Sequence, residues 1–124
     1  MVYISRRAYR PFTPPTDVIE LADKIVILVE IAGIRAEDLK ITLLNQNLLI
    51  TGFRERPRHS GPAYHQVEIV YGEFRIEVVL PWPVDSDSVS ANYQDGFLTV
   101  ELPRKAARQI PVAELKTAEK QDNS

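Results

Sequence analysis

Apolar and polar residues alternate with a period of two along most of this chain. In the clearest segment, 24–32, every second residue is a large aliphatic, and apolar residues also occupy positions between them. This pattern predicts a strand that is covered on both faces. The segment 73–80 alternates equally well, with Phe74, Ile76 and Val78 on one face. Such a period is typical of strands, in which successive side chains point to opposite faces.

Short turn signals separate the alternating segments, because the nine prolines and five glycines divide the sequence into short pieces. Asn45-Gln46 and Asp95-Gly96 each join two apolar runs, and Asn, Asp and Gly tolerate positive φ, so we predict two hairpins there. A turn or a single helical turn is expected at 33–38, and a long loop at 54–63. The expected strands are 16–21, 24–32, 39–44, 47–53, 64–69, 73–80, 89–93 and 97–102.

Short strands without a long helix indicate an all-β fold, namely an antiparallel β-sandwich, although the strand order cannot be read from the sequence. Residues 1–15 have no periodicity and are predicted to form a short flexible arm. The sandwich domain is expected to occupy 16–103. Residues 104–124 are predicted to form a polar tail that contains one apolar island, Ile110-Pro111-Val112, and a weak helical pattern at 113–121.

Composition narrows the class of protein. Hydrophobic residues make up 44% of the 124 residues and charged residues 26%, which are ordinary globular values. A net charge of -2 is too balanced for phosphate neutralisation to drive binding to nucleic acid. The chain has no cysteine, hence no disulfide or thiolate chemistry, and no apolar run near the ~20 residues of a membrane helix. With no secretory signal, we expect a cytoplasmic protein that binds neither nucleic acid nor membranes.

The sequence offers little to catalysis, and we expect no enzyme and no cofactor. The five glycines form neither a dinucleotide loop nor a phosphate loop. His59 and His65 are the only histidines and fall in or beside a predicted loop, where a zinc site would need carboxylates from elsewhere. Glu73 and Glu77 share a strand face, which is more typical of a salt-bridged solvent face than of acid–base catalysis.

Two charged segments have alternative interpretations. The basic stretch 54–59 could contact an acidic partner, but a solvated loop explains it more simply. The first twelve residues contain arginines and aromatic residues that could bind RNA weakly. A flexible arm is the simpler interpretation there too, and its aromatic residues Tyr3, Tyr9 and Phe12 are candidates for contact with unfolded proteins.

Three motifs in a fixed order resemble those of the α-crystallin domain. Tyr71-Gly72-Glu73-Phe74, followed by Leu80-Pro81, is similar to a strand-and-turn signature of that domain. The segment 91–103, with Ala91, Asp95-Gly96 and a closing proline, resembles its most specific motif. Ile110-Pro111-Val112 is similar to the Ile-x-Ile/Val motif of the family's tail. The resemblance covers about residues 15–112 and identifies the chain as a member of the small heat shock proteins, bacterial type.

The resemblance implies a function and a fold. Small heat shock proteins are ATP-independent chaperones, or holdases, that bind unfolding proteins and prevent their aggregation under stress. Their domain is an immunoglobulin-like sandwich that forms homodimers and higher oligomers, in which a strand of a long loop crosses to the partner. Here the crossing strand is expected to be Tyr64, His65, Gln66 and Val67, and the partner strand Thr16, Asp17, Val18, Ile19 and Glu20.

The family's tail motif lies in an apolar groove of another subunit. The groove is expected between 39–44 and 89–93, lined by Ile41, Leu43, Val89 and Ala91. The residues themselves support this role, since Ile110 and Val112 project to one side of an extended segment and Pro111 restricts φ between them. The alternative is that the island covers the edge of its own sandwich.

Two departures from the family pattern affect the expected assembly. Ile76 stands where bacterial members usually have an arginine, so an ion pair near the dimer interface is in doubt, and an apolar contact is its expected replacement. The arm is shorter than in many relatives, which favours small or polydisperse oligomers. Two other functions stay open: a co-chaperone-like sandwich that docks one folded partner, and an enzyme that uses Glu and His.

Overall fold

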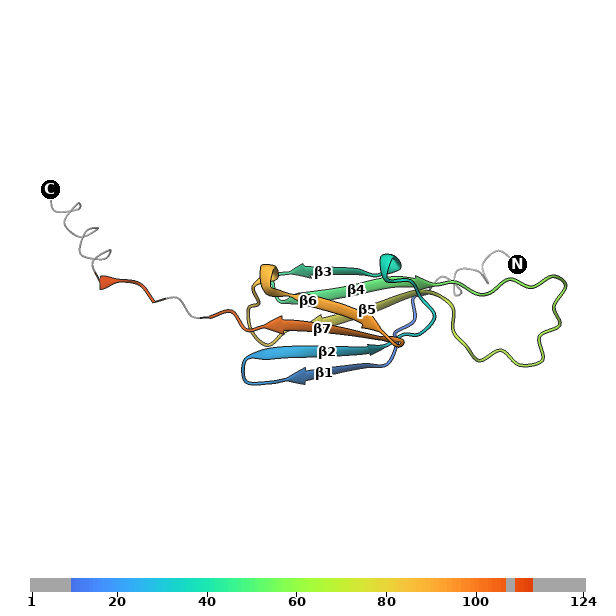
Figure 1. The fold of residues 1–124 in the computed structure, drawn as a ribbon, viewed down its shortest axis with the longest axis horizontal. Helices are drawn as coiled ribbons and strands as arrows, with labels where there is room; N and C mark the ends of the chain where they lie inside the picture. Colours follow the sequence, from blue (N-terminus) through green and yellow to red (C-terminus); the bar gives the residue numbers. More distant parts are fainter. Residues whose placement is uncertain (1–9, 107–108, 113–124) are drawn as a thin grey trace.

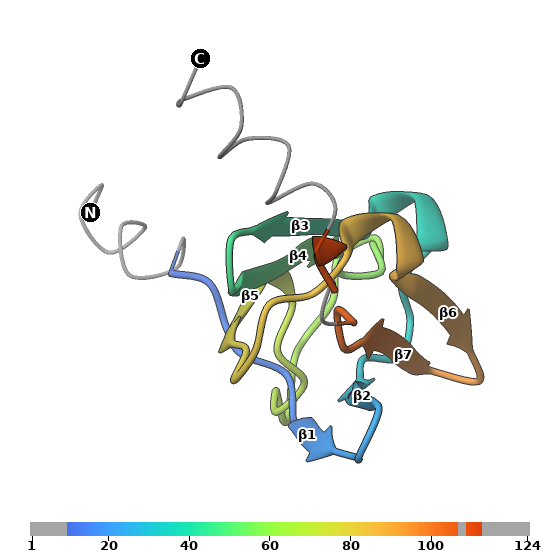
Figure 2. The same ribbon diagram turned by 90° about the vertical axis from the view of Figure 1, so that its left-hand side faces the viewer.

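Two antiparallel sheets face each other in the computed structural model, which describes residues 10–106 and 109–112 (Figure 1). One sheet has the order β1-β2-β7-β6 and the other the order β3-β4-β5. Figure 2 shows them as two layers. The all-β, immunoglobulin-like sandwich expected from the sequence is therefore confirmed. The strands are β1 (Thr16–Glu20), β2 (Lys24–Glu30), β3 (Lys40–Leu44), β4 (Asn47–Arg54), β5 (Gly72–Val79), β6 (Ser90–Gln94) and β7 (Phe97–Pro103).

All but one of the predicted strands are present, close to their predicted bounds. The expected helical turn is the short 3-10 helix η1 (Ala36–Asp38), and a second one, η2 (Ser86–Ser88), precedes β6. The prediction of a strand at 64–69 is wrong for the isolated chain, because this segment has no regular structure. No described strand lies beside it to supply ladder hydrogen bonds, and an extended segment without them is not stable.

Both predicted hairpins form at the residues that tolerate positive φ. Asn45 has φ 56° in the β3–β4 turn, and Asp95 and Gly96 have φ 54° and 80° in the β6–β7 turn. In the β6–β7 turn both central residues have positive φ, the geometry whose twist matches that of the flanking strands, whereas in the β3–β4 turn only the first central residue, Asn45, has positive φ. These turns bring β3 against β4 and β6 against β7 in the observed register.

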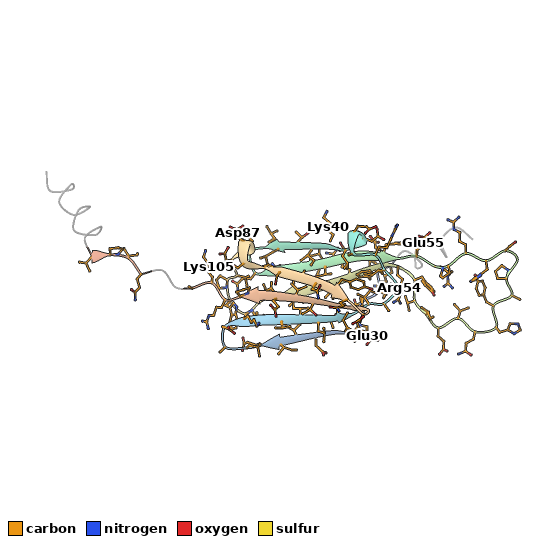
Figure 3. All side chains as sticks on the ribbon, in the orientation of Figure 1. Glu30, Lys40, Arg54, Glu55, Asp87 and Lys105 are labelled. Atoms are coloured by element: carbon orange, nitrogen blue, oxygen red, sulfur yellow. The ribbon has the colours of Figure 1, made fainter. Side chains whose placement is uncertain are left out.

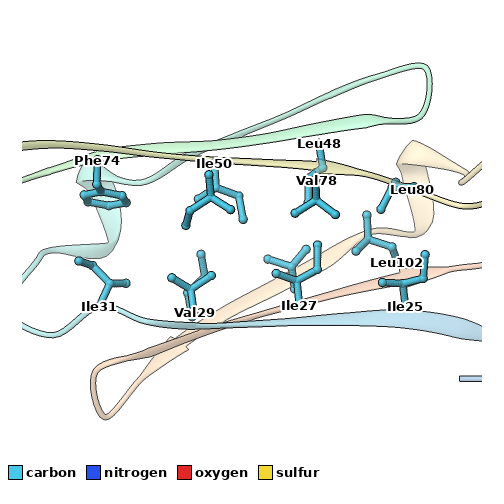
Figure 4. Close-up of a cluster of buried hydrophobic side chains, with 13 residues drawn as sticks. Ile25, Ile27, Val29, Ile31, Leu48, Ile50, Phe74, Val78, Leu80 and Leu102 are labelled. Carbon is cyan, nitrogen blue, oxygen red and sulfur yellow. The ribbon is translucent and has the colours of Figure 1, made fainter. Parts of the chain in front are cut away.

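The hydrophobic core lies between the two sheets and is made by the inward residues of the alternating pattern (Figure 4). Phe74, Ile76 and Val78 face it from β5, as predicted. Val26 and Leu28 on the outer face of β2 are only half-buried, so the predicted cover of this strand is complete on one side only. The buried residues are Ile25, Ile27, Val29, Ile31, Leu48, Ile50, Phe74, Ile76, Val78, Leu80, Leu98, Val100 and Leu102.

The last residues of the predicted arm are attached to the sandwich. Phe12 forms a parallel bridge with Phe74, and their ring centroids are 5.8 Å apart. Two backbone hydrogen bonds tie Phe12 to Glu73 and Arg75, and Pro14 is buried. Within the described residues, packing of the domain therefore extends to Phe12, ahead of the boundary predicted at residue 16.

Candidate interaction surfaces

An apolar hollow opens between the edge strands β3 and β6, one from each sheet. Its volume is about 370 Å³. Ile41, Leu43 and Val89 are half-buried in its walls, and Leu48 is fully buried at its base. The lining is Ile41, Leu43, Leu48, Ser86, Val89 and Ala91. The structure thus brings together all four residues predicted for the groove, and we refer to them with Leu48 and Ser86 as the β3–β6 hollow.

Hydrogen bonds fix the side of the hollow formed by η2 and β6. The Tyr93 hydroxyl on β6 donates to the Ile31 carbonyl at 2.7 Å. The carboxylate of Asp85 caps η2 by accepting from the Asp87 N–H at 3.1 Å and from the Ser88 hydroxyl at 3.3 Å. The hollow is therefore preformed, and the edge strands beside it offer backbone groups to an extended segment. This arrangement is suited to binding a short apolar peptide.

The tail is attached to the sandwich up to Lys105 and carries its apolar island beyond that point. The Arg104 N–H donates to the Asp23 carbonyl at 2.8 Å, and the Lys105 N–H donates to the Pro83 carbonyl at 3.2 Å. The guanidinium of Arg104 lies 4.7 Å from the centre of the Trp82 ring. Ile110 and Val112 are 58% and 63% exposed and do not line the β3–β6 hollow. The weak helical pattern at 113–121 lies outside the described residues.

Strand β1 has one open edge. It pairs with β2, and a hydrogen bond closes each end of this pairing. The Leu21 N–H donates to the Lys24 carbonyl, and the Glu30 N–H donates to the Pro15 carbonyl. Both hydrogen bonds use odd-numbered residues of the β1 segment. In an antiparallel pair the N–H and carbonyl groups of alternate residues point to opposite edges. Those of Thr16, Val18 and Glu20 therefore point away from β2, toward the open edge. The predicted partner strand thus lies at a sheet edge that can accept another strand.

The segment 55–71 forms a long loop that projects beyond the end of the sandwich (Figure 1). It contains the predicted crossing strand, where Tyr64 and Val67 are 56% and 53% exposed. His59 and His65 are exposed as well. Within residues 10–106 and 109–112, no group of three or more His, Cys, Asp or Glu is arranged to hold a metal ion.

Arg54 at the end of β4 holds the base of this loop (Figure 3). Its guanidinium donates to the Val70 carbonyl at 3.0 and 2.5 Å and to the Ala32 carbonyl at 3.3 Å. It also lies 5.3 Å from the ring centre of Phe12 and 5.7 Å from that of Tyr71. Sequence analysis assigned Arg54 only to a basic stretch, because residues 32 and 70 are too distant in the sequence to reveal these contacts.

Other sequence expectations have plain structural outcomes. Glu77 pairs with Arg75 at 2.6 Å on the exposed face of β5, as expected of a salt-bridged face. Ile76 is 3% exposed and packs in the core of its own chain, so its side chain lies inside the sandwich and not at an outer surface.

Among the helices of the described residues, none has the length and apolar character needed to cross a membrane.

Comparisons with known proteins agree with this geometry. A family model described as the Hsp20/alpha crystallin family matches residues 17–116. The chain is 30% identical to small heat shock protein C2 of Rickettsia felis over 104 residues, which cover 83% of this chain and 68% of that protein. It is 28% identical to spore protein SP21 of Stigmatella aurantiaca over 123 residues, 96% of this chain and 73% of that protein.

Solved structures show the same sandwich. A small heat-shock protein from Xylella fastidiosa superposes with a TM-score of 0.72 at 25% identity, covering 82% of this chain and 94% of that one. Heat shock protein 16.0 from Schizosaccharomyces pombe gives a TM-score of 0.70 at 28% identity, covering 81% and 97%.

Proposed function

This chain belongs to the Hsp20/alpha crystallin family, the small heat shock proteins, and we propose that it is an ATP-independent holdase for unfolding proteins. Its partners are unfolded or partly folded client proteins and other copies of itself, and its place of action is the cytoplasm. The observation that carries this proposal is the β3–β6 hollow, which is open to solvent in a chain whose tail presents an exposed Ile110-Pro111-Val112 motif.

The motif of one subunit occupies the β3–β6 hollow of another in the proposed assembly. Ile110 and Val112 lie two residues apart, so both side chains enter from the same side of an extended tail. Full burial of an apolar side chain contributes about 1.5–3 kcal/mol, so a contact made by two such residues is reversible. A client segment with similar apolar spacing can then take the same hollow when the tail leaves.

A dimer forms in the same proposal when Tyr64, His65, Gln66 and Val67 of one chain add to the open edge of β1 in another. The exposed apolar residues of the loop and of β1 support this pairing, since Val67 and Val18 are 53% and 51% exposed. Exposed apolar residues and unpaired strand edges favour aggregation in β-proteins unless a partner covers them. Heat or subunit exchange uncovers these surfaces, and clients then bind there without any nucleotide.

Light scattering tests the holdase activity directly. We expect an aggregation-prone enzyme, heated without nucleotide, to scatter much less light when an equimolar amount of this protein is present. Bovine serum albumin at the same mass concentration controls for crowding. Unchanged scattering would contradict the proposal and would favour a sandwich that docks one folded partner.

Size-exclusion chromatography tests the role of the tail. Ile110→Ala together with Val112→Ala removes most of the apolar surface that would enter the hollow, so we expect a smaller oligomer. Gln109→Ala, an exposed polar neighbour, is the matched control and should leave the mass unchanged. If the double variant elutes with the wild-type mass, the motif does not link subunits.

A further inference from the structure

Backbone bonds hold the root of the tail, directly after β7, on two sides. On one side the Arg104 N–H donates to the Asp23 carbonyl at 2.8 Å, in the turn between β1 and β2. On the other side Arg104 forms an antiparallel bridge with Val84, and the Lys105 N–H donates to the Pro83 carbonyl at 3.2 Å. These contacts fix how the chain leaves the sandwich.

A side-chain contact closes over the same root. The guanidinium of Arg104 lies 4.7 Å from the centre of the Trp82 ring, within the range of a cation–π contact. Trp82 is half-buried and packs against the core, so the ring that receives the guanidinium is itself held in place. Its Nε1 atom is buried and has no hydrogen-bond acceptor among the described residues, so packing orients the ring. We refer to the Arg104–Trp82 contact and the Lys105–Pro83 hydrogen bond as the tail clamp.

The antiparallel bridge sets the direction in which the tail leaves. In an antiparallel pair, later residues of one segment lie opposite earlier residues of the other. Beyond the Arg104–Val84 bridge the tail therefore runs toward Trp82, and Ala106 lines a hollow beside that ring. Ser86, which lines the β3–β6 hollow, lies in the opposite direction along the same segment. The root of the tail thus runs away from the hollow of its own chain.

The tail is nevertheless long enough for its motif to reach that hollow. Lys105 and Asp87 of η2 lie at the same end of the sandwich (Figure 3). Lys105 is bonded to Pro83, and the three residues from there to Ser86 span at most about 10 Å. Ile110 follows Lys105 by five residues, which span up to about 17 Å when extended. Direction, and not length, therefore opposes docking of the motif in its own chain.

We propose that the tail clamp makes Arg104 and Trp82 specificity-determining residues of the assembly, because it directs the motif into the hollow of another subunit and away from its own. The inference rests on the proposed docking of the motif in the β3–β6 hollow. A tail that turned back would lose the Lys105–Pro83 hydrogen bond and displace the guanidinium from the ring. Both docking modes bury the same motif, so this loss shifts the population toward docking between subunits.

Cysteines in the full chain distinguish the two docking modes, because the natural chain has no cysteine. Ala91→Cys places a thiol in the hollow, and Val112→Cys places one in the motif. Under mild oxidation, a motif in the hollow of another subunit gives an interchain disulfide, and a motif in its own hollow gives an intrachain disulfide. Non-reducing gels and peptide mass spectrometry measure both products. We expect the interchain product to dominate in this parent chain.

Substitutions in the clamp should change the ratio of the two products. Adding Arg104→Ala should raise the ratio of intrachain to interchain disulfide about two- to fivefold, the population change that corresponds to one exposed cation–π contact. Lys105→Ala is the matched control, since it removes a neighbouring exposed basic side chain but keeps the backbone N–H and the ring contact. It should leave the ratio unchanged. Arg104→Lys keeps a cation that can lie over the ring and should retain most of the parent ratio.

Fluorescence checks the clamp itself, because Trp82 is the only tryptophan. In the chain without cysteines, Arg104→Ala uncovers one face of the ring, so the rate of quenching by acrylamide should rise. Lys105→Ala should leave this rate unchanged. Unchanged quenching in Arg104→Ala would show that the guanidinium does not cover the ring and would overturn the proposal.

Equal disulfide ratios in Arg104→Ala and Lys105→Ala would also overturn the proposal, and so would a mainly intrachain product in the parent chain. Either result leaves the docking of the motif in the hollow intact. If no disulfide forms in any variant, the motif does not enter the hollow, and the proposed docking fails together with the clamp. Light scattering with a heated enzyme reads the holdase activity separately and requires no cysteine.

Discussion

Gly52 is required by packing and not by its backbone conformation. It lies in β4 directly opposite Phe74 of β5, whose ring is fully buried. A Cβ added at Gly52 would lie 2.2 Å from the ring carbon Cζ of Phe74 and 2.6 Å from Cε2. The absence of a side chain at one residue therefore makes the space that the largest core side chain fills.

We expect Gly52→Ala to lower the free energy of unfolding by about 1–3 kcal/mol, as is typical when a methyl group is forced into a packed core. Urea unfolding followed by circular dichroism measures the change. Phe74→Leu removes the clashing ring, so the double variant should lose less stability than the sum of the two single variants. Ser60→Ala removes only a hydroxyl from an exposed loop residue and should leave the free energy of unfolding nearly unchanged. Strict additivity of the first two variants would contradict the packing argument.

At the scale of elements, the long loop depends on Arg54 for its attachment. The guanidinium reaches carbonyls on both the loop and the segment after β2, which a planar fork can do and a lysine ammonium cannot do with the same geometry. The loop itself contributes no residue to the buried core. Its base can therefore loosen while the sandwich stays folded.

We expect Arg54→Lys to speed thermolysin cleavage within 55–71 several-fold and to change the free energy of unfolding by no more than about 1–2 kcal/mol. Arg58→Lys makes the same chemical change at an exposed loop position and is the matched control. Cleavage products are identified by mass spectrometry. Equal cleavage of the two variants would show that the fork of Arg54 does not hold the loop.

Local sequence patterns predicted most of the elements, because alternation and turn chemistry are properties of neighbouring residues. Asn45 and Asp95 adopt positive φ at the two predicted hairpins, and the inward residues of β2 and β5 are buried as the alternation predicts. The strand predicted at 64–69 is absent, because β-branched residues indicate an extended backbone but do not indicate whether a neighbouring strand is there to pair with it. Phe12 was placed in the flexible arm because a bridge to residue 74 leaves no local signal.

The candidate hollow was predicted from the family resemblance, which placed a groove between the segments 39–44 and 89–93 with Ile41, Leu43, Val89 and Ala91 in its lining. Leu48 was missed although it lies directly opposite Leu43 in the predicted hairpin, which was the available signal. Ser86 was missed because nothing in the sequence indicated that η2 would form one wall.

At the scale of the whole molecule, strand order determines which edges are open to partners. The order β1-β2-β7-β6 leaves β1 at the outside of its sheet, and its even-numbered residues point their backbone groups outward. An exposed edge with Val18 and Ile19 partly exposed favours strand addition. The proposed dimer therefore depends on N–H groups that the isolated fold does not use.

Val18→Pro tests whether the dimer can be lost while the sandwich stays folded. Proline removes one outward N–H at the open edge but none of the hydrogen bonds to β2, and edge strands tolerate proline at such positions. We expect the far-UV circular dichroism of a folded sandwich together with a loss of dimers in native mass spectrometry. Val18→Thr keeps the N–H and should retain them. Ile19→Pro removes a bond to β2 and should unfold the sheet. Dimers that persist in Val18→Pro would mean that subunits associate through another surface.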